Sequence, residues 1–415
     1  MNIAVYHNLM PGGNKRVLFD AVCGMKANGH TVDVHTLSVS AEGFKPLAGI
    51  ADRVITYPIA TLPAHLPGPV GLVLMLLPLS RTNRAIAERL NAGTYDIAWV
   101  VNCFVTQHPI LLRYLRRPTI LYTAEHYRQF YDNFWAQQSD LATPSPRRGA
   151  RRVARKWLLS IVARLDRASI ACARNVLVNS CFTRENLLRY YGKDSKVVYP
   201  GIDLTLFRRF AIEKENLVIS VGGLNPVKGH DVVVRSLGRI PVTRRPRLTI
   251  VADRVEDTVA RLRLERLANS CGVDLEIRLR IEDSTLVEIY NRAKVTVCAN
   301  ILEPFGLVPL ESMACGTPVV AANEAGFRET TLDGETGFLV DRDEGAMSSA
   351  IDMLLGNEAL QRALGRNGLE RVRHFGLDSF WSQVERQLQC VARDNRLDRT
   401  WTDSDPTLQS RSNRS

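Results

Sequence analysis

The sequence predicts an α/β protein built from two doubly wound, Rossmann-like domains. Three observations carry this prediction. Short β-branched runs alternate with longer helical patterns, the alternation restarts near residue 200, and 415 residues suffice for two domains of about 150 to 200 residues each. Hydrophobic residues at 45% and charged residues at 23% are typical of a folded globular chain.

The first block of alternating patterns opens with an apolar run at Ile3 to Tyr6, a helical pattern at Arg16 to Ala27 and a second apolar run at Thr31 to His35. Further strand-like runs are Ile97 to Val101 and Thr119 to Tyr122. Strands separated by helices are typical of parallel βαβ units. We therefore predict one domain over residues 1–205.

The second block begins with a strand-like run at Leu217 to Gly222 and continues with Leu248 to Val251, a helix at Thr258 to Ser270 and strands near Leu275 and Val295. We predict a second domain over residues 206–375. Ligands of parallel sheets bind at the carboxyl ends of the strands. A site made by both domains is therefore expected in a cleft between them.

After Asp343 the sequence shows helical patterns only, at Ala346 to Leu355, Ala359 to Phe375 and Ser379 to Ala392. The stretch that follows is polar and has hardly any apolar residues. We predict a final helix over residues 376–393 and a disordered tail over residues 394–415.

The formal charge of +11 favours polyanionic partners such as nucleic acid, phosphorylated small molecules or an anionic membrane surface. Eight cysteines form no C-x-x-C pair and no Cys/His cluster at metal-ligand spacing. The start, Met1 to Tyr6, lacks a basic leader, and the longest apolar stretch, Val70 to Leu79, is shorter than the roughly 20 residues that span a bilayer. A cytoplasmic protein without a membrane-spanning segment is expected.

The segment from Glu303 to Gly316 carries the clearest chemical pattern. Gly306 follows a strand-like run and opens a helical pattern, which ends where Gly316 suits the position after the last turn. The amides of Phe305, Gly306 and Leu307 then lie at a helix N-terminus and suit sugar hydroxyls or phosphate oxygens. Carboxylates at Glu303 and Glu311 would add charge-assisted hydrogen bonds to ligand hydroxyls.

The sequence around these glutamates resembles that of the retaining glycosyltransferases of family 4. Glu-Pro-Phe-Gly-Leu is followed by Glu-Ser-Met-Ala-Cys-Gly-Thr-Pro-Val-Val320 and later by Asp-Gly-Glu-Thr-Gly-Phe-Leu-Val340. The segments Val221 to Asp231, Val178 to Asn186 and Val197 to Asp203 are also similar to the family, and the resemblance covers about residues 1–392. It implies the GT-B fold, with an N-terminal acceptor-side domain, a C-terminal domain that binds the nucleotide sugar, and a final helix that returns to the N-terminal domain.

The resemblance also implies roles for single residues. Glu303 and Glu311 match the family's E-x7-E motif, with Glu303 expected at the donor sugar ring and Glu311 at the ribose hydroxyls. Lys228 is expected to neutralise the diphosphate. The family's arginine beside the first glycine of this strand is replaced by Gly223, so a second cation would come from Arg254 or Arg328, or be absent.

The loop Pro11-Gly12-Gly13 follows the first strand and is either a plain turn or, as in the family, a close approach of backbone to the diphosphate and acceptor. Gly13 is the preferred contact, with Gly12 beside it.

A histidine that the family often presents to the donor sugar has an imperfect counterpart here. Aligned on Glu125 and Arg128, it falls at Ala124, so His126 is displaced by two residues. A catalytic and a structural role for His126 both remain open, and His108 is a more distant candidate.

Asp341-Arg-Asp343 has the D-x-D form that some transferases use to hold a divalent ion. Here Asp343 precedes a helical pattern, so a helix cap is the favoured interpretation. We predict no metal site. Leaving-group charge would be stabilised by Lys228 and helix N-termini.

Residues Arg147 to Arg167 form a basic amphipathic pattern, with eight Arg or Lys residues and one acid, Asp166. Two interpretations remain open: contact with an anionic membrane surface, and an ordinary helix that buries its apolar face. No nucleic-acid-binding module is recognisable, so nucleic acid is not an expected partner.

The resemblance implies transfer of a sugar, with retained configuration, from a nucleotide-diphosphate sugar to a glycan or lipid-linked acceptor in cell-surface polysaccharide or glycolipid synthesis. The donor would be a UDP-, GDP- or ADP-sugar, and no further cofactor is expected. The alternatives are a nucleotide-sugar epimerase or phosphorylase with the same fold, and a non-catalytic sugar-nucleotide-binding membrane protein.

Overall fold

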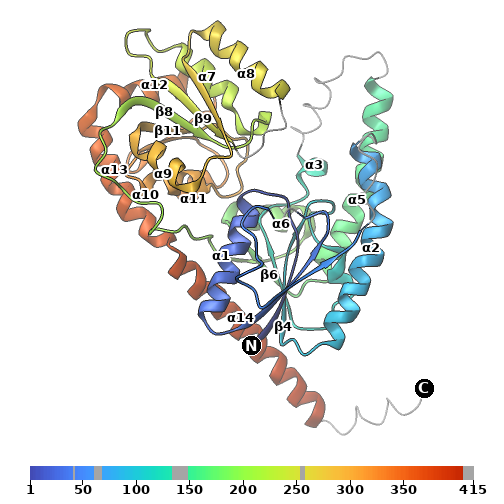
Figure 1. The fold of residues 1–415 in the computed structure, drawn as a ribbon. Coiled ribbons are helices and arrows are strands. Elements are labelled where there is room, and N and C mark those ends of the chain that lie inside the picture. The colour runs from blue at the N-terminus through green and yellow to red at the C-terminus, as the bar shows by residue number, and fades with distance from the viewer. Residues whose placement is uncertain (41–42, 60–67, 133–147, 253–257, 405–415) are drawn as a thin grey trace. The chain divides into compact units, whose positions relative to one another are not determined.

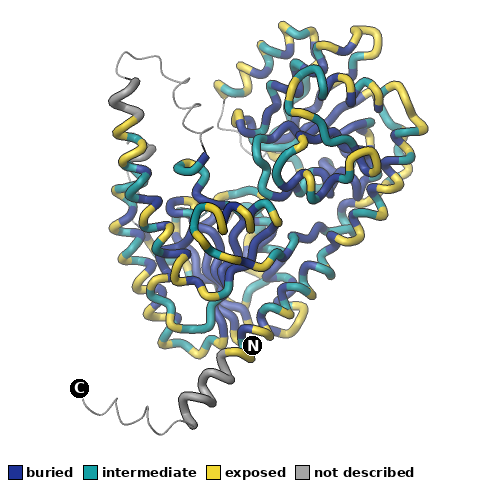
Figure 2. Tube along the Cα trace, turned by 180° about the vertical axis from the view of Figure 1, so that it is seen from behind, coloured by how far each residue is buried: buried dark blue, intermediate teal, exposed yellow. Residues whose placement is uncertain are grey.

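The computed structural model describes residues 1–40, 43–59, 68–132, 148–252 and 258–404, and the chain divides into two compact units (Figure 1). The first unit holds residues 1–179, 183–198 and those from 381 on, and the second holds residues 180–182 and 199–380. Each contains a parallel β-sheet with helices, so the predicted α/β class with two doubly wound sheets is confirmed. The central strands of each sheet are largely buried (dark blue in Figure 2), whereas β3, β7 and β10 at the sheet edges are only partly buried or exposed.

The sheet of the first unit has the strand order β3-β2-β1-β4-β5-β6-β7. Its strands are β1 (Asn2–Asn8), β2 (Thr31–Leu37), β3 (Arg53–Tyr57), β4 (Ile97–Cys103), β5 (Thr119–Thr123), β6 (Asn175–Val178) and β7 (Lys196–Val197). Its helices are α1 (Gly13–Ala27), α2 (Gly68–Ala92), α3 (Arg128–Tyr131), α5 (Arg148–Ala171) and α6 (Cys181–Tyr191), with a 3-10 turn η1 (Ile110–Arg113). The order reverses between β1 and β4, and the loops after these strands are where such a sheet binds ligands.

The sheet of the second unit has the order β10-β9-β8-β11-β12-β13. Its strands are β8 (Glu215–Val221), β9 (Arg247–Ala252), β10 (Leu275–Leu279), β11 (Ala293–Cys298), β12 (Val319–Ala322) and β13 (Gly337–Val340). Its helical elements are η2 (Pro226–Lys228), α7 (His230–Gly238), α8 (Thr258–Cys271), α9 (Asp283–Arg292), α10 (Leu307–Ala314), α11 (Phe327–Thr330), α12 (Glu344–Gly356), α13 (Glu358–Val372) and η3 (Arg373–Phe375). Here the order reverses between β8 and β11, so the loops after β8 and β11 occupy the switch point.

The borders of the units differ from the predicted 205/206 and 375/376. The chain enters the second unit at Tyr199, because the Tyr199 ring stacks on Phe305 with centroids 5.6 Å apart and Ile202 and Phe207 lie in that unit's core. The later border falls between Phe380 and Trp381.

Helix α14 (Leu377–Ser404) is longer than the predicted helix over 376–393. The helix continues to Ser404, into the stretch for which a disordered tail was predicted from residue 394, and residues 405–415 lie outside the described part. Neither glycine nor proline occurs between Gly376 and Pro406, so nothing in the local sequence ends the helix earlier. From Trp381 on, α14 belongs to the first unit, where Trp381 Nε1 donates to the Asp20 carbonyl at 2.7 Å.

Helix α5 contains the basic segment predicted over Arg147 to Arg167, although Arg147 itself lies outside the described residues. Within the described ranges, no helix combines the length and the apolar character needed to cross a bilayer.

Candidate functional site

The loop between β11 and α10 carries Glu303, as the sequence predicted. Gly306 caps α10 with a φ of 100°, and Gly316 follows the last turn with a φ of 71°. A Cβ on Gly306 would lie 2.9 Å from the Phe327 ring, so both the backbone conformation and the space require glycine there. Glu303 therefore stands just before a helix N-terminus, and Glu311 stands inside the helix.

Contacts with neighbouring loops hold the backbone around Glu303. The Ile301 amide donates to the Val227 carbonyl at 2.8 Å, and the Gly326 amide donates to the Glu303 carbonyl at 2.9 Å. A Cβ on Gly326 would come within 2.4 Å of the Phe305 Cα, so the two loops approach each other as closely as backbone allows. The backbone that carries Glu303 is thus held by the loop after β8 and by the segment around Gly326.

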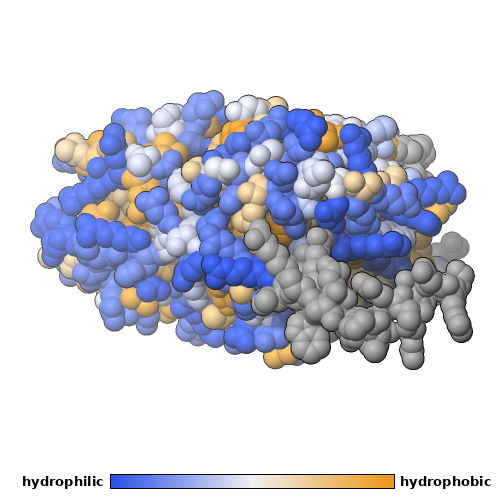
Figure 3. Space-filling view, turned by 90° about the horizontal axis from the view of Figure 1, so that it is seen from below, coloured by the Kyte–Doolittle hydropathy of each residue, from blue (hydrophilic) through white to orange (hydrophobic). Residues whose placement is uncertain are grey.

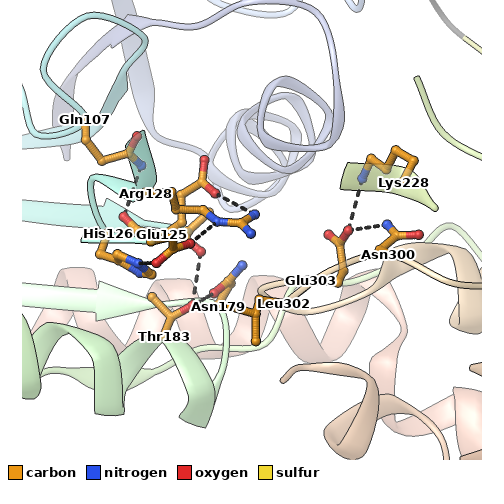
Figure 4. A network of polar contacts seen from close by, with 12 residues as sticks. Gln107, Glu125, His126, Arg128, Asn179, Thr183, Lys228, Asn300, Leu302 and Glu303 are labelled. Carbon is orange, nitrogen blue, oxygen red and sulfur yellow. Dashed lines mark hydrogen bonds and ion pairs between the residues drawn. The ribbon is translucent and has the colours of Figure 1, made fainter. Parts of the chain in front are cut away.

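Lys228 and Glu303 form an ion pair with Nζ and Oε2 3.0 Å apart (Figure 4). Asn300 donates its Nδ2 hydrogen to the same carboxylate oxygen at 2.5 Å. The Lys228 side chain is 29% exposed and that of Glu303 22%, so the pair is open to solvent on one side. The alkyl chain of Lys228 lies over Gly222, where a Cβ would be 3.0 Å from Lys228 Cδ.

This cluster of Lys228, Asn300 and Glu303 joins the loops that follow β8 and β11, at the switch point of the second sheet. Asn300 was not among the predicted site residues. Its signal was a polar residue just after a buried strand, three positions before Glu303.

The side chain of Glu311 is buried, with only 4% of the residue exposed, and its Oε2 accepts a hydrogen bond from the Tyr290 hydroxyl at 2.9 Å. Burial, and after it the neighbouring Glu311 carboxylate, raises the pKa of Tyr290 well above its ordinary value. The predicted contact of Glu311 with ribose hydroxyls stays a prediction, and Tyr290 is the partner that orients this carboxylate.

His230 is a buried residue of the segment Val221 to Asp231 for which no role was predicted. Its Nε2 lies 3.1 Å from the Gly222 carbonyl and its Nδ1 lies 3.0 Å from Ser220 Oγ. Burial lowers the pKa of His230 to about 4. The neutral ring therefore donates from Nε2 to the Gly222 carbonyl and accepts at Nδ1 from the Ser220 hydroxyl. These two hydrogen bonds hold the segment between Gly222 and His230, which contains Lys228.

Acidification is expected to destabilise the protein through His230. The pKa of His230 in the folded state is about 4, below the ordinary value of 6.5. Between these pH values the unfolded chain binds a proton at His230 that the folded chain does not bind. The free energy of unfolding therefore falls as the pH drops from about 6.5 towards 4. The loss at pH 5 relative to pH 7.5 is about 2 kcal/mol for this residue. Urea unfolding at both pH values measures it, and His230→Gln, which keeps a donor and an acceptor, is expected to reduce the pH dependence. An unchanged pH dependence in that variant contradicts the neutral assignment.

In the first unit, Gly12 precedes α1 with a φ of 143° and a ψ of −170°. Nothing lies within 4 Å of a Cβ built there, so conformation rather than crowding requires glycine. Gly13 is the first residue of α1. The glycine loop thus follows β1 at the switch point of its sheet, which is where the prediction expected it.

His126 is buried, and its Nε2 lies 2.6 Å from Asp132 Oδ1. Arg128 Nε donates to Asp132 Oδ2 at 2.9 Å. Burial raises the pKa of Asp132, but the hydrogen bonds and charges of His126 and Arg128 outweigh it and hold that pKa below its ordinary value. These contacts describe the structural alternative for His126, and its catalytic role stays a prediction.

The neighbouring candidates are also engaged. His108 is fully buried, with Nδ1 2.8 Å from Asp166 Oδ1. Ala124, where the family histidine would fall, donates its amide to Asn102 Oδ1 at 3.3 Å. Asn102 is a buried polar residue near the end of β4 that was not predicted from the sequence, and its Nδ2 has no hydrogen-bond partner among the residues that the structure describes.

Arg254 and Arg328 were predicted as possible replacements for the family arginine that is absent at Gly223. Arg254 lies outside the described residues. Arg328 is exposed, and its Nε donates to Asn323 Oδ1 at 2.9 Å. A third arginine, Arg342, donates to the Ala299 carbonyl at 2.8 Å and so lies beside the loop that carries Glu303.

Asp343 caps α12, because its Oδ1 accepts from the amides of Gly345 and Ala346 at 2.8 and 3.0 Å. The predicted helix cap is confirmed. In the part of the chain that the structure describes, no three His, Cys, Asp or Glu residues gather as metal ligands would.

Two family models match the chain in adjoining stretches. Residues 11–206 match the model described as Glycosyltransferase Family 4, and residues 204–371 match that described as Glycosyl transferases group 1. D-inositol 3-phosphate glycosyltransferase of Xylanimonas cellulosilytica is 32% identical over 50% of this chain and 55% of that protein. The enzyme of the same name from Corynebacterium glutamicum is 28% identical over 72% of each chain. The chain thus matches about half the length of several curated relatives.

Solved structures share the fold. Sucrose-phosphate synthase from Thermosynechococcus elongatus matches with a TM-score of 0.70 and 22% identity, over 94% of this chain and 99% of that one. HepE of Anabaena, in complex with UDP and glucose, matches with a TM-score of 0.69 and 17% identity, over 94% and 100%.

Proposed function

The chain belongs to glycosyltransferase family 4 and has the GT-B fold, and from this premise we propose that it transfers a sugar from a nucleotide-diphosphate sugar to a hydroxyl group of an acceptor. The observation that carries the proposal is the cluster of Lys228, Asn300 and Glu303 at the switch point of the second sheet. It sets one cation and one carboxylate beside the N-terminus of α10, where a charged donor finds both signs of charge and free amides.

The diphosphate of the donor would compete with Glu303 for the ammonium group of Lys228. Once Lys228 turns to the phosphates, the Glu303 carboxylate can accept hydrogen bonds from sugar hydroxyls, while Asn300 keeps it in place. The amides of Phe305, Gly306 and Leu307 would complete the contacts. The donor is a UDP-, GDP- or ADP-sugar, and complexes of the structurally similar HepE with UDP and UDP-glucose support the nucleotide part.

The proposed transfer retains the configuration at the anomeric carbon. The acceptor hydroxyl attacks from the face of the leaving diphosphate, a new C–O bond forms as the bond to the diphosphate breaks, and the acceptor's proton passes to a diphosphate oxygen. Neither a cofactor nor a metal ion is part of this proposal. Charge that develops on the leaving group is stabilised by Lys228 and by helix amides.

The proposed acceptor is a glycan or lipid-linked molecule of cell-surface polysaccharide or glycolipid synthesis. A basic helix, α5, supports work at the cytoplasmic face of an anionic membrane. The names of the curated relatives favour a second candidate acceptor, a phosphorylated inositol. A sugar linked to lipid through phosphate and a phosphorylated inositol both carry negative charge beside hydroxyl groups, so both suit a chain with a net charge of +11.

Nucleotide release from a panel of UDP-, GDP- and ADP-sugars tests the proposal, with inositol phosphates and lipid-linked sugars as acceptors. Release that depends on an acceptor, and that Glu303→Ala abolishes, is expected. Conversion of the donor sugar without any acceptor would instead identify an epimerase, and dependence on inorganic phosphate a phosphorylase. A donor-induced rise in thermal stability without turnover on any acceptor would identify a binding protein.

A further inference from the structure

Large apolar side chains are exposed on the first halves of α2 and α5. Leu74 and Leu77 on α2 are 50% and 60% exposed, and Val153 and Trp157 on α5 are 71% and 65% exposed. The face of the molecule drawn in Figure 3 shows hydrophobic residues scattered among hydrophilic ones, which is ordinary for a protein surface. We call the four side chains on α2 and α5 the apolar pair-face.

The two helices pack against each other in the first unit and run in the same direction (Figure 1). The segment around η1 bonds to both: Asn83 Oδ1 on α2 accepts from the Leu111 amide at 3.0 Å, and Asp166 Oδ1 on α5 accepts from the His108 amide at 2.8 Å. Leu74 and Trp157 each precede these anchors by nine residues (83 − 74 and 166 − 157), about 13 Å of helix rise. The apolar pair-face therefore lies at one end of the helix pair.

Positive charge borders the apolar pair-face. On α2 the exposed stripe continues from Leu77 to Arg81 and Arg84 at helical spacing, and on α5 Lys156 and Arg164 are exposed. The one acid of α5, Asp166, is fully buried and bound to His108 and to Tyr191. On α2 the one acid is Glu88, paired with Arg84. The surface thus combines apolar side chains with an excess of basic ones.

We propose that the apolar pair-face and its basic border dock onto the interface of an anionic lipid bilayer. Leucine, valine and tryptophan side chains enter the boundary between headgroups and acyl chains, and the basic side chains meet anionic headgroups. The apolar stretch Val70 to Leu79, too short to span a bilayer, supplies the α2 part of the contact. This docking surface rests on the proposed membrane contact of α5 and extends it to α2 and to four named apolar side chains.

Anionic lipid, rather than nucleic acid, fits the apolar component. The phosphates of nucleic acid are neutralised by Lys and Arg side chains, and exposed Leu74 and Leu77 would stay in water in such a complex. A lipid interface uses both components at once.

Flotation of the full chain with vesicles tests the proposal. Vesicles of phosphatidylcholine alone are compared with vesicles that also contain about 30% phosphatidylglycerol, an anionic lipid. The wild type is expected to bind the anionic vesicles. The double variant L77S/W157S is expected to bind them at least about tenfold more weakly, since it removes two exposed apolar side chains without touching the core. R81E/R84E is expected to lose the preference for anionic lipid.

The matched control is V242S/V259S, which changes two side chains in the second unit that are 78% and 70% exposed. Its vesicle binding is expected to equal that of the wild type. The docking surface is wrong if the wild type does not bind anionic vesicles, or if L77S/W157S and the control bind equally. It is also wrong if light scattering shows a dimer that only L77S/W157S dissociates while vesicle binding is unchanged, because the face then joins two copies of the chain.

Donor-induced thermal stabilisation separates this inference from the proposed function. The nucleotide sugar is expected to raise the thermal stability of L77S/W157S as much as that of the wild type. Both substituted residues belong to the first unit, whereas Lys228 and Glu303 belong to the second. A wild type that binds vesicles but no nucleotide sugar would refute the proposed function and leave the docking surface standing.

Discussion

Replacing Lys228 by alanine is expected to lower the rate of sugar transfer by about two to three orders of magnitude. The ammonium group lies 3.0 Å from the Glu303 carboxylate, at the switch point of the second sheet. Without it, the developing charge of the diphosphate loses its main counter-charge, and Glu303 loses its ion-pair partner. Steady-state kinetics with the best donor of the panel measure the effect, and the loss is expected in kcat as well as in KM.

Lys228→Arg and Lys196→Ala are the comparisons for this variant. Arginine keeps the charge but not the compact ammonium group, so partial activity is expected. Lys196 is an exposed residue of β7 in the first unit, and its loss is expected to leave the rate unchanged. Activity of Lys228→Ala within about threefold of the wild type would refute the assigned role of Lys228.

The second large effect is expected for Gly229→Ala, which is predicted to destabilise the protein by about 2 to 4 kcal/mol and to abolish donor binding. Gly229 has a φ of 68°, and a Cβ there would lie 2.1 Å from the Ala299 carbonyl oxygen. The new methyl group must push the loop after β8 away from the loop after β11. Lys228 adjoins Gly229 in the chain, and Asn300 adjoins Ala299. Separation of the two loops would therefore move both Lys228 and Asn300 away from their positions at the Glu303 carboxylate.

Gly334→Ala is the matched control, because Gly334 has a φ of 70° and nothing lies within 4 Å of its Cβ position. It carries the backbone strain of a left-handed residue, about 1 to 2 kcal/mol, without the collision. Chemical unfolding and donor-induced thermal shifts of both variants measure the difference. Equal destabilisation and equal donor binding in the two variants would show that backbone strain, not the approach of the two loops, governs Gly229.

Several parts of this molecule follow from local sequence. Eight of the strands (β1, β2, β4, β5 and β8 to β11), the position of Glu303 ahead of α10, the glycines at 306 and 316 and the Asp343 cap were predicted from runs of fewer than about ten residues. These features depend on side-chain period, backbone conformation and hydrogen bonds between close neighbours in the chain, which is information that a short segment contains.

Other parts could not be read in this way. The predicted helix ended at residue 393, eleven residues before the end of α14 at Ser404, because a polar composition was taken for disorder although no glycine or proline occurs between Gly376 and Pro406. The contacts of His126 with Asp132, and of Glu311 with Tyr290, place two predicted site residues against buried partners. No pattern in the sequence indicated either partner.

The sequence by itself thus determined that the chain has two parallel sheets and that a carboxylate, a lysine and glycine-rich loops follow particular strands. Only the tertiary structure decided that Lys228 and Asn300 meet on one oxygen of Glu303, and that apolar side chains of α2 and α5 share one end of a helix pair. The physical reason is distance along the chain. Lys228 and Glu303 are 75 residues apart, and such contacts arise from the order of strands in a sheet and from packing, which no local period encodes.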